Sequence, residues 1–153
     1  MAGNIIASDQ VYSKAEIETL ALLMETVIPS SGDGRFPAAS DSAIFEDFVA
    51  SSEQYRELII TALQLLNEIS GSDYQGLSVS ARLEVTQKFY SIRSAPVSTL
   101  LSLLAQCYYR DDRVLKAIGL EPRAPHPKGF EVEQGDWGLL EPVKKRGKIY
   151  RDA

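Results

Sequence analysis

The sequence predicts an all-α protein, a compact bundle of about six helices followed by an extended, mostly irregular C-terminal tail. Apolar residues recur at helical spacing through most of the chain, and residues typical of helix ends stand between these runs. No stretch shows the alternation expected of a strand. From residue 120 onward the helical period is lost, and four of the seven prolines occur there. We therefore expect a helical body over residues 1–119 and a tail over residues 120–153.

The first predicted helix begins at Ser13, which can form a capping box with Glu16, and it ends before Pro29. Residues 30–40 are rich in Ser, Gly and Asp and are expected to form a surface loop. A short second helix follows over about residues 41–50, because apolar residues return there at helical spacing.

The third helix is expected to start from a cap at Ser51 or Ser52 and to end at Gly71. The fourth should start at Ser78 or Ser80. Both contain apolar residues three and four positions apart, so each should bury one face against the rest of the body.

The fifth helix should open at Pro96, because a proline is tolerated in the first turn of a helix. Its sequence is apolar on nearly all sides, which is typical of a helix at the centre of a bundle. A last short helix is expected to be capped by Asp111 or Asp112 and to end at Gly119.

Composition limits the function. The 153 residues fit one domain, and the net charge of −5 argues against nucleic acid or an anionic membrane surface as a partner. No apolar run approaches the roughly 18 residues of a membrane span, so no direct membrane insertion is expected. Neither a secretory leader nor a twin arginine is visible. We expect a cytoplasmic protein, with a periplasmic location only if a leader was removed or export is shared with a partner.

Few residues could carry chemistry by themselves. His126 is the only histidine, so one chain cannot supply a site with two imidazoles, and it is interpreted as a surface or docking residue. Cys107 is the only cysteine, so no intramolecular disulfide can form; its apolar helix favours inert packing over nucleophilic catalysis. We assign no catalytic, cofactor-binding or metal-binding residue to the chain.

The tail combines prolines with apolar and aromatic residues, a composition unlike that of a disordered linker. It should lie extended across a surface and place its larger side chains in pockets, either on its own helical body or on another protein. The candidate partner-binding residues are Phe130, Trp137, Leu139, Leu140, Ile149, Tyr150 and Arg151.

Three C-terminal stretches resemble the gluconate 2-dehydrogenase subunit 3 family: residues 108–119 (YYRDDRVLKAIG), 127–130 (PKGF) and 134–137 (QGDW). Residues 27–29 (VIP) and 44–48 (IFEDF) fit the N-terminal half of the same pattern, though less specifically. The resemblance covers most of the chain. Exported members of this family begin with a twin-arginine leader, and this sequence does not.

The resemblance implies a small, non-catalytic subunit that aids maturation of a large flavoprotein of the glucose–methanol–choline oxidoreductase type. That partner carries FAD and oxidises sugars or sugar acids, and a cytochrome c subunit or another electron acceptor often completes the complex. The family name does not identify the substrate. Two alternatives remain open: a stand-alone helical adaptor, and a small enzyme with a pocket between its helices.

Overall fold

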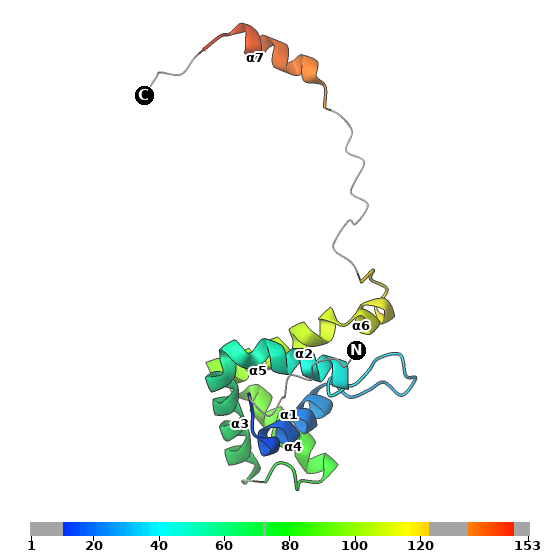
Figure 1. The fold of residues 1–153 in the computed structure, drawn as a ribbon, viewed down its shortest axis with the longest axis vertical. Coiled ribbons are helices and arrows are strands. Elements are labelled where there is room, and N and C mark those ends of the chain that lie inside the picture. Colours follow the sequence, from blue (N-terminus) through cyan, green and yellow to red (C-terminus); the bar gives the residue numbers. More distant parts are fainter. Residues whose placement is uncertain (1–10, 72, 123–134, 149–153) are drawn as a thin grey trace, which may run out of the picture. The chain divides into compact units, whose positions relative to one another are not determined.

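The structure is a computed structural model that describes residues 11–71, 73–122 and 135–148. Its described part contains helices and no strand (Figure 1). The chain divides into two units, Met1–Pro122 and Arg123–Ala153. For the residues that the structure describes, the predicted all-α class with a compact arrangement of six helices is confirmed.

The helices of the first unit begin and end close to their predicted limits. They are α1 (Lys14–Val27), α2 (Ser42–Ser52), α3 (Arg56–Ser70), α4 (Val79–Ser91), α5 (Ala95–Arg110) and α6 (Asp112–Ala117). The predicted capping box is present, since the Ser13 amide donates to Glu16 Oε2 at 2.7 Å and the Glu16 amide donates to Ser13 Oγ at 3.4 Å. Gly71 ends α3 with φ of 73°, a left-handed conformation that favours glycine.

Helix α5 occupies the centre of the bundle, as its nearly continuous apolar surface predicts. It packs against α2, α3 and α6, while α1 packs against α3 and α4 (Figure 1). The α5 side chains buried in this core are Val97, Leu100, Leu103, Leu104, Cys107 and Tyr108.

The prediction that Ser51 or Ser52 caps the third helix is wrong. Both serines lie inside α2, which is followed by a 3-10 turn, η2 (Glu53–Tyr55), and α3 begins at Arg56. Ser52 is fully buried, where it accepts a hydrogen bond from Tyr12 Oη and donates one to the Val49 carbonyl, both at 2.8 Å. The Ser52 hydroxyl therefore does not cap a helix, because it bonds Tyr12, a residue 40 positions away in the sequence.

The remaining caps resolve the open alternatives. Ser78 rather than Ser80 caps α4, because its hydroxyl accepts from the Ala81 amide at 3.3 Å. Asp111 rather than Asp112 caps α6, because its carboxylate accepts from the Arg113 amide at 2.8 Å.

The loop between α1 and α2 folds back on itself. The Ser31 amide donates to the Phe36 carbonyl at 3.0 Å, and Gly34 turns the chain with φ of 71°. The Ala39 amide then donates to the Ile28 carbonyl at 2.9 Å, which returns the chain to the end of α1. This loop forms one side of the polar corner described below.

No helix among the described residues combines the length and the apolar content that crossing a bilayer requires.

Candidate functional site

The described part of the tail contains a short helical stretch that the sequence did not predict. A 3-10 turn, η3 (Trp137–Leu140), runs directly into α7 (Glu141–Lys145; orange in Figure 1). Asp136 caps this stretch, because its Oδ1 accepts from the Gly138 amide at 2.9 Å. Pro142 lies in the first turn of α7, where it needs no amide donor. These local bonds form a helix that is too short to show an apolar period.

Four apolar side chains of this stretch are exposed, and we call them the apolar row. Their exposed fractions are 68% for Trp137, 74% for Leu139, 42% for Leu140 and 55% for Val143. The short helices of the segment therefore do not cover their own apolar side chains. Exposed apolar side chains also occur in the body, for example Val79 at 72% and Leu83 at 47%, but in the row four of them fall within seven consecutive residues.

The apolar row brings together three of the predicted partner-binding residues, Trp137, Leu139 and Leu140. The other four, Phe130, Ile149, Tyr150 and Arg151, lie outside the described residues, as does His126. Val143 belongs to the row but was missed. The signal that could have found it is its position three residues after Leu140, which places both on one side of a helix.

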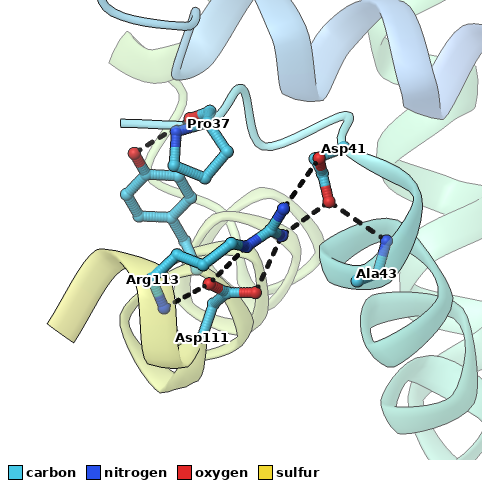
Figure 2. A network of polar contacts seen from close by, with 6 residues as sticks. Pro37, Asp41, Ala43, Asp111 and Arg113 are labelled. Carbon is cyan, nitrogen blue, oxygen red and sulfur yellow. Dashed lines mark hydrogen bonds and ion pairs between the residues drawn. The ribbon is translucent and has the colours of Figure 1, made fainter. Parts of the chain in front are cut away.

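A second feature, the polar corner, joins α6 to the start of α2 (Figure 2). Arg113 reaches across to Asp41, with Nη2–Oδ1 at 2.6 Å and Nη1–Oδ2 at 3.1 Å. The same guanidinium bonds Asp111, with Nε–Oδ1 at 3.0 Å and Nη2–Oδ2 at 2.9 Å. Figure 2 shows Arg113 between the two carboxylates, which are themselves the caps of α2 and α6.

The hydrogen bonds from Arg113 hold the pKa values of Asp41 and Asp111 below the ordinary 3.8, although burial opposes the shift. The same bonds, first to Asp111 and then to Asp41, raise the pKa of Arg113. All three groups are therefore charged at neutral pH and neutralise one another in part. Such a cluster fixes two helix ends, and the lowered pKa values make its two carboxylates weak bases.

The loop completes this attachment of α6. Arg35 Nη2 donates to the Ala117 carbonyl at 2.9 Å, and Tyr108 Oη donates to the Pro37 carbonyl at 3.1 Å. The ends of α5 and α6 are therefore bonded to the loop between α1 and α2. The last helix before the tail is thus held firmly on the bundle.

A cavity of about 260 Å³ lies next to the polar corner, between α2 and the end of α5. Asp47, Cys107 and Arg110 are among its lining residues. Arg110 Nη2 is already bonded to Asp47 at 2.6 Å and to Ser51 at 2.9 Å. Burial, and then the Asp47 carboxylate, raises the pKa of the Cys107 thiol, so the sulfur is protonated at neutral pH and poorly nucleophilic. This agrees with the interpretation of Cys107 as packing.

No group of three or more His, Cys, Asp or Glu side chains placed to hold a metal ion occurs among the residues that the structure describes. Comparison with family models finds no match, and comparisons with curated proteins and with solved structures find no significant match.

Proposed function

We propose that this chain is a non-catalytic accessory subunit that binds and stabilises a large FAD-dependent dehydrogenase of the glucose–methanol–choline type. The observation that carries the proposal is the apolar row, exposed on a segment that is already helical. The row starts at the tryptophan of the 134–137 motif, which is one of the stretches that resemble the gluconate 2-dehydrogenase subunit 3 family.

The physical reason is the free energy that burial of the row would release. Transfer of apolar surface out of water contributes about 25 cal/mol per Å², and aromatic anchors in a pocket commonly dominate an interface. Because the stretch is helical before it binds, less conformational entropy is lost on docking than for an unstructured peptide. The apolar row is therefore suited to insertion into a groove of a larger protein.

In this proposal the partner carries the FAD and the oxidation of a sugar or sugar-acid hydroxyl. Electrons leave through a cytochrome c subunit or another acceptor bound to that partner. The small chain contributes assembly and stability, and it supplies no group to the reaction. The cytoplasmic location expected of the complex stays a prediction, which fractionation of cells that express both chains would check.

The test is co-expression with a glucose–methanol–choline-type flavoprotein from the same genome, followed by purification on a tag carried by the small chain. We expect the two chains to elute together with flavin absorbance, whereas the small chain alone shows protein absorbance only. A chain that ends at Gly119 should remain helical but should no longer retain the flavoprotein. Flavin bound stoichiometrically to the isolated small chain would contradict the proposal.

The alternative of a stand-alone adaptor also uses the apolar row, with a partner that holds no flavin. It would be favoured if the flavoprotein were not retained while another protein co-purified in stoichiometric amount and was lost with the Trp137→Ala variant. The small-enzyme alternative would instead require turnover by the isolated chain that depends on a residue lining the 260 Å³ cavity.

A further inference from the structure

The tail segment presents basic side chains beside the apolar row. Within residues 136–148 the sequence has four Lys or Arg and two Asp or Glu, while the whole chain carries a net charge of −5. Lys144 is engaged by Glu141 at 3.2 Å. Within residues 135–148, neither Lys145 nor Arg146 forms an ion pair, and both side chains are exposed.

The positions of these two residues differ with respect to the apolar row. Arg146 follows Val143 by three residues and keeps helical backbone angles (φ −70°, ψ −17°), so it lies on the same side of the helix as Val143, the last member of the row. Lys145 follows Val143 by two residues, or about 200° of rotation, which places it on the opposite side. Of these two cations, Arg146 therefore lies beside Val143, and Lys145 lies on the side of the helix away from it.

We propose that the apolar row docks in a groove of the flavoprotein whose rim carries a carboxylate, and that Arg146 binds this carboxylate. The inference rests on the proposed function and adds the chemistry of the partner's surface. A planar guanidinium can bond both oxygens of a carboxylate at once. The ion pair would therefore attract the short helix to the groove and also fix its position along the groove.

An anionic membrane is a less suitable target for the same surface. The acidic body would be repelled from anionic lipid, and a row of four apolar side chains adds little insertion energy. A groove in a protein avoids both problems, because it requires negative charge only at its rim.

The experiment measures binding of the full-length chain to the co-expressed flavoprotein at low and high salt. Arg146→Gln should weaken binding about three- to tenfold at low salt, mainly through slower association, and the difference should shrink at high salt. Lys145→Gln removes the same charge from the same segment, yet it should change affinity less than about twofold. Arg146→Lys keeps the positive charge but cannot bond both carboxylate oxygens through a planar group. Its affinity should lie between those of wild type and Arg146→Gln.

Equal effects of the two Gln variants, or no salt dependence of the Arg146→Gln difference, would overturn the rim carboxylate while leaving the accessory function intact. Failure of the wild-type chain to bind the flavoprotein would instead overturn the proposed function. Sedimentation with phosphatidylserine–phosphatidylcholine vesicles provides the remaining comparison. Binding to them that depends on Arg146, with flavoprotein affinity unchanged in Arg146→Gln, would assign the surface to lipid and reject the proposal.

Discussion

In the bundle, Phe48 and Leu100 are completely buried between helices, whereas in the tail segment Trp137 and Leu139 are more than two-thirds exposed. The two regions use side chains of similar size and polarity. They differ because each bundle helix finds an apolar face to pack against within its own unit, and the short η3–α7 stretch does not cover its own. Under the proposed function, the first region provides stability and the second provides binding, and the predictions below test that division.

The largest effect is expected in the core. Phe48→Ala would leave a cavity at a site with 0% exposure and should lower the free energy of unfolding by about 3–5 kcal/mol. Trp137→Ala should change the same quantity by less than about 0.5 kcal/mol. Urea titration followed by far-UV circular dichroism measures both. If both variants lose a similar free energy of unfolding, the two regions contribute equally to stability and the division is wrong.

For binding of the flavoprotein, Trp137→Ala should have a large effect although its effect on stability is small. Trp137→Ala should weaken capture of the flavoprotein by more than about thirtyfold, because truncation of a buried interface tryptophan commonly costs over 2 kcal/mol. Tyr90→Ala is a matched control, since Tyr90 is an exposed aromatic residue of α4 in the body. If Trp137→Ala lowers the melting temperature of the free chain while its affinity is unchanged, Trp137 holds the tail on its own bundle.

A smaller effect is expected at the buried thiol. Cys107→Ala should lower the free energy of unfolding by about 1–2 kcal/mol, because it removes packing volume at a site with 1% exposure. Activity of the reconstituted complex should stay within a few-fold, and the same holds for His126→Ala. Steady-state kinetics of the assembled variants check this. Loss of turnover by orders of magnitude with assembly intact would identify a catalytic residue.

The smallest effect concerns the polar corner and its pH dependence. The folded-state pKa values of Asp41 and Asp111 lie below the ordinary 3.8, so their stabilising contribution is complete above that value and is lost as pH falls through the lowered values. Arg113→Gln should cost about 0.5–1 kcal/mol at pH 7, since the groups are partly exposed. Unfolding measured from pH 7 to pH 3 should show this difference shrinking in acid; a constant difference would assign the loss to packing.

Much of the bundle could be predicted because its signals are local. The Ser13–Glu16 capping box, the turn at Gly71 and the apolar surface of α5 depend on residues within a few positions of one another. The predicted cap of the third helix was wrong because of a contact with a residue far away in the sequence. Ser52 resembles a helix cap in sequence, but Tyr12 draws its hydroxyl into the core. In the tail, the cap at Asp136 and the row member Val143 were missed because a helix of five residues is shorter than the window in which a period can be recognised.

By itself, the sequence determined the all-α class, the order of the helices, most of their ends and the presence of large apolar residues in the tail. These depend on backbone preferences and on hydrophobic periodicity, which are properties of neighbouring residues. Only the tertiary structure decided that Arg113 joins Asp41 to Asp111, and that Cys107 is a buried thiol beside Asp47 and Arg110. The contact between Asp41 and Arg113 spans 72 positions and the contact between Asp47 and Arg110 spans 63, and no local pattern in the sequence shows which distant helices will pack together.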